Sequence, residues 1–303
     1  MIYASIIFRQ LITMMIYVGI GFILCKKNLI TESGIKSFVG LLLYTILPCA
    51  IINSFWRDSS SEQTIQMLLV FALSVGLLAI SILLSHLFFR KKPIDDFSAA
   101  FSNAGFMGVP LISATLGEDK VFYIAWIVAM INIMQWVYGQ RLLKKTETKL
   151  RVKDVLLTPF TVALLIGIAL YLSPLKPPEL IKNCISTIAS CNSPIAMIIL
   201  GYYLCRVPLK SVFTTKSAYF TSAVRLLIIP VVSLLFLAII PGCGIEIKMA
   251  LLVAACTPVG SNVAVYAQKL DLDYSRSVIL VCQSTLFCII TIPLVILLST
   301  VVF

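Results

Sequence analysis

Charged residues are scarce in this chain: Asp, Glu, Lys and Arg together make up 12% of its 303 residues. A typical soluble domain is about 25% charged and about 45–50% apolar. This chain, in contrast, is 60% hydrophobic. A water-soluble fold could not cover so much apolar side chain with so few charges. The composition therefore excludes an ordinary soluble protein and predicts an all-α polytopic membrane protein in a lipid bilayer.

Histidine is scarce, Cys-x-x-Cys pairs and core acids are missing, and each shortage excludes a kind of chemistry. The chain has one histidine, His86, and its nine cysteines include no Cys-x-x-Cys pair, so we expect no metal centre, disulfide framework or cofactor. All thirteen acidic residues fall in loops or at the ends of apolar runs, and Arg225 is expected near the inner end of its run. A membrane-embedded enzyme would need clustered aspartates or a histidine with a carboxylate, so no enzyme is expected. Without core charges, no proton relay or acidic sodium site is expected either.

Long apolar runs are what the chain has in abundance. A helix needs about 20 apolar residues to cross a bilayer. Ten runs are candidates, near residues 4–25, 34–55, 64–89, 97–117, 121–140, 157–173, 180–204, 217–240, 247–267 and 277–301. The connections between them are short, so the sequence predicts ten transmembrane helices and no sizeable soluble domain.

The net charge of +11 is distributed unevenly between the two predicted membrane faces. With ten spans and both termini outside, 18 of the 24 Lys and Arg residues fall on the inner side. Such a positive-inside bias sets the orientation of a membrane protein. We therefore predict a multi-pass protein of the cell membrane with a cytoplasmic central loop. The basic residues are interpreted as orientation signals, and no nucleic-acid partner is expected.

The longest polar connection, 141–156, divides the chain into two halves. Residues 1–140 would form a first five-helix repeat, 141–156 a cytoplasmic basic linker, and 157–303 a second five-helix repeat. An odd number of spans in each half forces the second repeat into the inverted orientation. Pro48 in the second run and Pro194 in the seventh occupy corresponding places, which supports a repeat.

Two of the runs, the fourth and the ninth, are interrupted by glycine, proline and amide residues at 101–110 and 255–262. Irregular backbone at membrane depth is tolerated only where it is buried in protein or lines a cavity. Paired interruptions in the two halves of a transporter indicate its binding site. The sequence therefore predicts broken helices 4 and 9 that cross at mid-membrane.

The predicted substrate-binding residues lie at these two breaks. Each break would direct unpaired N–H groups and the positive end of a half-helix dipole toward one point, an arrangement that suits a carboxylate. Amides could donate further hydrogen bonds, and glycines would allow close approach. The candidates are Ser102, Asn103, Gly105, Gly108, Pro258, Gly260, Ser261 and Asn262. The Gly105–Gly108 pair also matches a helix-packing pattern, and Asn132, Asn192 and Gln283 are interpreted as interhelical contacts.

Both breaks resemble those of a known family. The run 103–111, Asn-x3-Met-Gly-Val-Pro-Leu, is similar to the fourth-span motif of the auxin efflux carrier family, and 255–260, Ala-x2-Pro-x-Gly, to its ninth-span crossover. Ten spans in a five-plus-five arrangement extend the similarity over the whole chain. Ser102 stands where the plant exporters have proline, and Val259 where they have a polar residue. The resemblance therefore points to the bacterial malate and dicarboxylate permease-like branch rather than to auxin.

The resemblance implies an inverted-repeat carrier that exports or exchanges small organic anions such as malate or related carboxylates. Spans 1, 2, 6 and 7 would form a scaffold, and the other spans would move the site across the membrane in an elevator-like step. In this correspondence Asn103 is the crossover asparagine and Pro258 the ninth-span crossover proline.

Two alternatives stay open at this point. A sodium-coupled symporter of the bile-acid transporter type shares the inverted five-plus-five plan, although it would want carboxylates or clustered oxygen ligands for sodium. A non-transporting membrane sensor or scaffold would use the same fold without moving a substrate. The sequence leaves the oligomeric state open, with a homodimer among the options.

Overall fold

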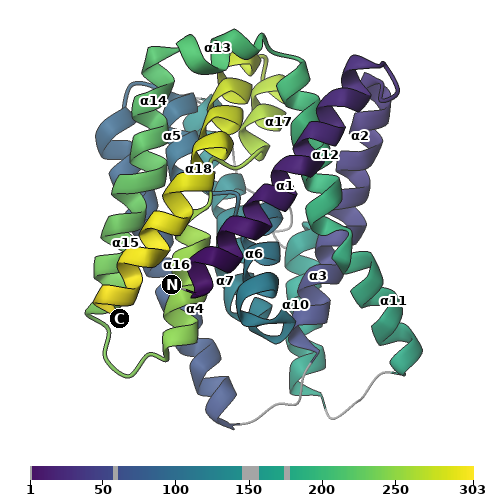
Figure 1. Cartoon of the computed structure of the whole chain (residues 1–303). Helices are drawn as coiled ribbons and strands as arrows, with labels where there is room; N and C mark the ends of the chain where they lie inside the picture. The colour runs from purple at the N-terminus through teal and green to yellow at the C-terminus, as the bar shows by residue number, and fades with distance from the viewer. Residues whose placement is uncertain (1, 57–60, 145–156, 174–177) are drawn as a thin grey trace.

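The computed structural model describes residues 2–56, 61–144, 157–173 and 178–303, and every regular element in these ranges is a helix (Figure 1). Most of the predicted central linker, beyond Lys144, lies outside these ranges. The first half contains α1 (Ile2–Lys26), α2 (Glu32–Leu41), η1 (Leu42–Ile46), α3 (Leu47–Phe55), α4 (Ser61–Phe89), α5 (Pro93–Ala100), η2 (Ala104–Gly108), α6 (Val109–Leu116), η3 (Glu118–Lys120), α7 (Val121–Met134), η4 (Gln135–Gly139) and α8 (Gln140–Lys144). The second half contains α10 (Pro159–Leu172), α11 (Glu179–Ser190), α12 (Asn192–Cys205), α13 (Leu209–Thr214), α14 (Lys216–Ala223), η5 (Val224–Ile228), α15 (Ile229–Ala238), α16 (Ile245–Cys256), α17 (Asn262–Lys269) and α18 (Tyr274–Val302).

Seven helical segments in the described ranges are long and apolar enough to cross a membrane. They are Ile2–Lys26, Glu32–Phe55, Ile65–Phe89, Glu118–Lys144, Glu179–Cys205, Lys216–Ala238 and Tyr274–Val302. These match seven of the ten predicted runs. The fourth and ninth runs are each divided into shorter helices by the predicted breaks, and α10 has only 14 residues. The structure thus confirms an all-helical protein with several membrane-spanning segments, while ten spans in two inverted repeats stay a prediction.

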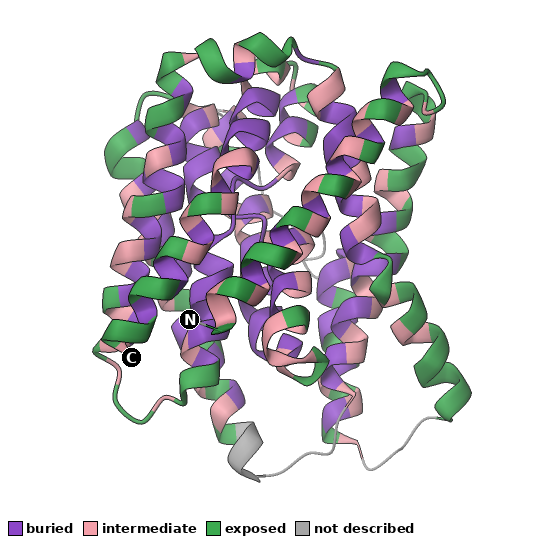
Figure 2. Cartoon of the chain, in the orientation of Figure 1, coloured by how far each residue is buried: buried purple, intermediate pink, exposed green. Residues whose placement is uncertain are grey.

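The outward side of α1 is exposed and apolar along its length. The exposed residues recur every three or four positions and are 41–58% exposed: Phe8, Ile12, Ile16, Ile20 and Ile23. The opposite side of the same helix is buried against its neighbours and is equally apolar. Across the molecule, exposed segments lie on the outward faces of the helices and buried ones inside (Figure 2). A helix that is apolar on all sides can pack one side against protein and expose the other side to lipid.

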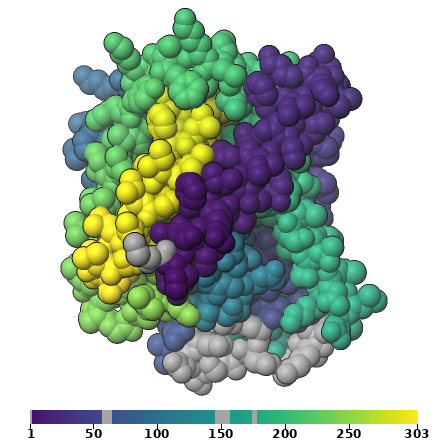
Figure 3. Space-filling view, in the orientation of Figure 1, coloured from purple at the N-terminus to yellow at the C-terminus, as the bar shows by residue number. Residues whose placement is uncertain are grey.

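Two glycines set the contact between α1 and α12. A Cβ on Gly21 would lie 2.1 Å from the carbonyl oxygen of Ile198, and a Cβ on Gly201 would lie 2.1 Å from that of Val18. No side chain fits at either position, so the two backbones approach directly, as small residues allow in membrane helices. The space-filling view shows α1, in purple, lying diagonally across this face of the molecule (Figure 3).

Three prolines in the apolar runs follow a wider turn of the helix. Pro48, Pro110 and Pro230 each stand two residues after the end of a π-helical turn, namely η1, η2 and η5. Proline lacks an N–H and its ring collides with the carbonyl group four residues earlier. A wider turn just before the proline relieves this clash without ending the helix.

For description, the helices are divided into two groups, which contact each other through α1 and α18, among other helices. In the first, the α12 group, α1 packs against α12, and α3 packs against α10 and α11. In the second, the α16 group, α4 packs against α5 and α7, and α16, α17 and α14 pack against α18. Both termini lie toward one end of the molecule, with the α15–α16 connection, and the α1–α2 turn and α13 lie at the other (Figure 1). The two breaks lie in the α16 group, in α5–α6 and α16–α17.

Candidate functional site

The two breaks meet in a short antiparallel backbone contact, which we call the crossover (residues 101–103 and 257–260). Asn103 donates its N–H to the carbonyl oxygen of Pro258 at 2.8 Å, and Gly260 donates its N–H to the carbonyl oxygen of Phe101 at 3.0 Å. Ser102 pairs with Val259 between these two bonds. Each break thus satisfies backbone groups that the other has freed, as a buried interruption must.

Neighbouring residues fix the crossover in place. A Cβ on Gly260 would lie 3.2 Å from the carbonyl oxygens of both Phe101 and Ser102, so glycine allows the two chains to approach. On the other side, the N–H of Val259 donates to the hydroxyl of Ser284 on α18 at 3.1 Å. The second break is therefore held both by the first break and by α18.

A small cavity of about 20 Å³ opens at the crossover. Six of the eight predicted site residues line it: Ser102, Asn103, Gly105, Gly260, Ser261 and Asn262. Asn132 and Gln135 of the fifth predicted run line it too, although the sequence interpretation left them out. A cavity of this size holds about one water molecule and is too small for an organic anion. The described conformation is therefore closed around the crossover.

The remaining two candidates do not line the cavity. A Cβ on Gly108 would lie 2.7 Å from the Cδ1 atom of Ile124, so this glycine allows close helix packing. Helix packing is the second interpretation that the Gly105–Gly108 spacing gave from the sequence. Pro258 contributes its carbonyl oxygen to the crossover through the bond from Asn103.

Side-chain amides connect the crossover to both helix groups. Asn262 donates from Nδ2 to Oε1 of Gln135 at 2.8 Å. Asn192, at the start of α12, donates from Nδ2 to the carbonyl oxygen of Gly105 at 3.0 Å. Asn192 was interpreted as an interhelical contact, and it is one, but its partner is a residue of the broken helix 87 positions away. Gln283, in contrast, bonds Ser222 and the Val212 carbonyl away from the cavity.

A larger cavity lies next to Asn192, between the α12 group and α6. This amide cavity has a volume of about 270 Å³, and its polar lining includes Gln10, Asn53, Ser113, Asn192 and Ser193. Oδ1 of Asn192 and Oγ of Ser193 are buried and have no hydrogen-bond partner among the described residues. Buried polar atoms are normally paired with protein or water, so this wall can accept or donate further hydrogen bonds.

A second large cavity, the tyrosine cavity, measures about 390 Å³ and includes Tyr202, Tyr203 and Tyr274 in its lining. It shares Tyr203 and Val265 with a cavity of about 20 Å³. That small cavity in turn shares Ser261 and Asn262 with the crossover cavity. The shared lining residues place the tyrosine cavity, the small cavity and the crossover cavity next to one another in that order.

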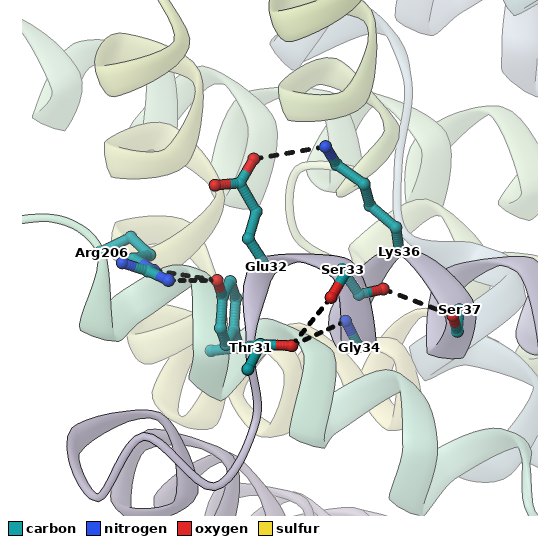
Figure 4. Close-up of polar contacts among 8 residues, drawn as sticks. Thr31, Glu32, Ser33, Gly34, Lys36, Ser37 and Arg206 are labelled. Atoms are coloured by element: carbon teal, nitrogen blue, oxygen red, sulfur yellow. Dashed lines mark hydrogen bonds and ion pairs between the residues drawn. The ribbon is translucent and has the colours of Figure 1, made fainter.

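Cations lie at the tyrosine cavity. Arg206 donates from Nε to the hydroxyl of Tyr202 at 3.0 Å and stacks 4.9 Å from the centre of its ring. The bond to Tyr202 raises the pKa of Arg206, so this side chain stays charged. Lys36 forms an exposed ion pair of 3.3 Å with Glu32 in the first turn of α2, which Thr31 caps (Figure 4). An anion that reaches this cavity meets a fixed positive charge.

Arg225 is the main residue that the sequence interpretation missed. Its side chain is 1% exposed and donates from Nη1 to the hydroxyl of Ser81 at 3.0 Å and to the carbonyl oxygen of Ala99 at 2.9 Å. Nη2 donates to the carbonyl oxygen of Ala255. Arg225 therefore joins the last turns of α5 and α16, directly before the two breaks. The expectation of an uncharged core is wrong here, because the guanidinium is buried among carbonyl groups.

Two acidic residues in the first turn of α5 are also buried, which the sequence did not indicate. Asp95 accepts from Thr221 at 2.6 Å and pairs with Arg276. Asp96 accepts from Ser85 at 2.8 Å and lies 2.9 Å from Nδ1 of His86, whose side chain is half-exposed. Both carboxylates are paired, which allows their burial at this helix end.

The family model described as "Membrane transport protein" matches residues 6–296, which cover nearly the whole chain and include both breaks. The chain belongs to this family. The resemblance to the auxin efflux carriers is confirmed, since this is the family that contains them.

Two relatives of this transport family align with the chain over most of its length. An "Uncharacterized transporter" of Methanothermobacter thermautotrophicus is 22% identical over 94% of the chain and 96% of its own length. A "Putative malonate transporter" of Rhizobium meliloti is 24% identical over 83% of the chain and 82% of its own length. The chain is therefore a membrane transporter, and the relatives match it as a whole rather than in one segment.

Proposed function

We propose that this membrane transport protein carries small dicarboxylate anions, such as malonate or malate, and binds them at the crossover. The observation that carries the proposal is the pairing of the two breaks, which gathers amides, hydroxyls and glycines from helices far apart in the sequence. The name of the Rhizobium meliloti relative supports a dicarboxylate.

The polarity of the broken helices favours an anion. The second pieces of both broken helices, η2–α6 and α17, begin at the crossover, next to Asn103 and Asn262. A helix begins with N–H groups that have no partner within the helix and with the positive end of its dipole. Two such ends beside amide side chains supply several donors and no acid, which suits a carboxylate.

Efflux or exchange is the direction that needs no coupling ion. An inside-negative membrane potential is worth about 2.3 kcal/mol per charge per 100 mV, and it drives anions outward. Uphill uptake of a dicarboxylate would have to be coupled to another gradient. We therefore propose efflux or exchange, and flux that stops without a sodium or proton gradient would contradict it.

The two helix groups suggest how the site would move. The α12 group comprises the predicted first, second, sixth and seventh spans and would be the scaffold. The α16 group carries both breaks and would slide past it, opening the crossover first to the tyrosine cavity and then to the amide cavity. This elevator step assumes ten spans in two inverted five-helix repeats, residues 1–140 and 157–303 joined by 141–156. We place both termini outside the cell membrane and the linker inside.

The experiment that tests the site is ligand-induced stabilisation of the purified protein in detergent, because a ligand that binds only the folded state raises its melting temperature. Malonate, malate, succinate, citrate, indole-3-acetate and sodium would be compared. We expect a dicarboxylate to stabilise the wild type. Asn103→Ala should weaken that binding by about 1.5–3 kcal/mol, the usual cost of a hydrogen bond to a charged group.

Asn183→Ala is the matched control, because this amide is exposed on α11, away from the crossover. It should respond to malonate as the wild type does. Stabilisation by sodium alone would favour the symporter of the bile-acid type. If no carboxylate stabilises the wild type, the chain is not a dicarboxylate carrier, and a sensor or scaffold role becomes the better account.

A further inference from the structure

The buried guanidinium of Arg225 stands where the two broken helices present their negative ends. Ala99 belongs to the last turn of α5 and Ala255 to the last turn of α16, and the carbonyl oxygens of both accept hydrogen bonds from this one side chain. In the part of the chain that the structure describes, no Asp or Glu pairs with Arg225. Its charge is therefore matched by two backbone carbonyl groups and the hydroxyl of Ser81 rather than by a carboxylate.

The electrostatics of the crossover follow from this contact. The C-terminal end of a helix carries roughly −0.5 of an elementary charge and the N-terminal end roughly +0.5. Two C-terminal ends together offset the charge of one guanidinium. The two N-terminal ends at the crossover then keep their positive potential, and the crossover as a whole favours an anion.

Carbonyl groups at the ends of broken helices are also what a transporter uses to bind a coupling cation. In this chain, Nη1 and Nη2 of Arg225 occupy such carbonyls on both broken helices at once. A guanidinium is always charged in proteins and cannot dissociate as sodium can. Because the guanidinium of Arg225 is part of the chain, no sodium ion from solution would be needed to bind these carbonyl groups.

We propose that Arg225 is a resident cation of the crossover, which holds the two broken helices together and lets a carboxylate bind without sodium. Arg225 does not line the crossover cavity, so it acts as a positioning residue through α5 and α16. The inference rests on the proposed function, because it assigns to the same site its charge balance and its independence from sodium.

The test measures malonate affinity of the purified protein in sodium chloride and in choline chloride at equal ionic strength. We expect wild-type affinity to agree within about twofold between the two salts, since the cation is already supplied by Arg225. Arg225→Lys keeps the charge and should bind malonate in both. Arg225→Gln and Arg225→Met remove it and should weaken binding at least about tenfold, because truncating a buried charged partner is costly.

Ser74→Ala is the matched control, because it removes a buried hydroxyl from α4, the helix of Ser81, that bonds the Val70 carbonyl within the helix and leaves the charge of Arg225 in place. It should bind malonate like the wild type. Equal binding by Arg225→Gln and Arg225→Lys would overturn the proposal, since hydrogen bonding rather than charge would then suffice. If the neutral variants do not fold, malonate binding by the wild type only in sodium chloride would still overturn the proposal, and Arg225→Lys would still have to bind malonate in both salts.

The outcomes separate this inference from the proposed function. Malonate binding by the wild type only in sodium chloride would leave the carrier function standing and overturn the role of Arg225. Absence of carboxylate binding in both salts would overturn the function and the inference with it. Binding in both salts that depends on the charge at position 225 would support both.

Discussion

At the scale of single residues, the crossover depends on how closely two backbones approach. A Cβ at position 260 would be 3.2 Å from two carbonyl oxygens, which is closer than atoms in van der Waals contact and involves backbone that cannot turn aside. We expect Gly260→Ala to lower the free energy of unfolding by about 1–3 kcal/mol, the usual cost of overpacking, and to weaken malonate binding. Denaturation in detergent and ligand-induced stabilisation measure the two effects. Gly19→Ala is the control, because nothing lies within 4 Å of its Cβ, and an equal loss in both variants would contradict the argument.

Local chemistry in the sequence predicts part of this site and not the rest. Glycine, proline and amide in one apolar run predicted the breaks, and six of the eight candidates line the crossover cavity. Arg225 was missed because its partners are 126 and 30 positions away, so no local pattern shows that its charge is matched. Gln135 was missed for the same reason, and Asn192 was interpreted only as an interhelical contact, since the partners of both residues become neighbours only after folding.

At the scale of elements, the contact between α1 and α12 depends on glycine rather than on side-chain packing. A Cβ on Gly201 would be 2.1 Å from the carbonyl oxygen of Val18, so the two helices must separate to admit it. We expect Gly201→Ala to lower the unfolding free energy by about 1–3 kcal/mol, and Gly201→Leu to lower it further. The melting temperature in detergent measures this. Gly40→Ala, with open space around its Cβ, should leave the melting temperature nearly unchanged.

The elements themselves were largely predictable, because an apolar run of sufficient length has no other stable form in a bilayer. The first run, predicted at 4–25, is the helix Ile2–Lys26, and the last, predicted at 277–301, is Tyr274–Val302. The local form of the helices was predicted less well where backbone geometry, rather than the length of an apolar run, decides the structure. The π-helical turns before Pro48, Pro110 and Pro230 depend on local steric relief. The short α10 does not follow from composition.

At the scale of the whole molecule, the predicted orientation can be tested through a native thiol. Cys243 lies in the α15–α16 connection, at the same end as both termini (Figure 1), and is predicted to face outward. Burial raises the pKa of Cys243, an effect that Lys248 opposes. Because the thiolate is the reactive form, the labelling rate should rise as the pH increases from 7 toward 9. With the exposed Cys184 and Cys191 replaced by serine, we expect a membrane-impermeant maleimide to label Cys243 in intact cells, and a further Cys243→Ser change to abolish that labelling.

The opposite end of the molecule gives the complementary half of the test. Lys27 is exposed in the α1–α2 turn and belongs to the basic face that the positive-inside rule places in the cytoplasm. In a Cys243→Ser background with the exposed Cys184 and Cys191 also replaced by serine, Lys27→Cys should react only after the cells are permeabilised. Labelling of Lys27→Cys in intact cells would reverse the orientation. Labelling of both ends from the same side would instead contradict the number of spans between residues 27 and 243, because that stretch crosses the membrane seven times in the ten-span scheme.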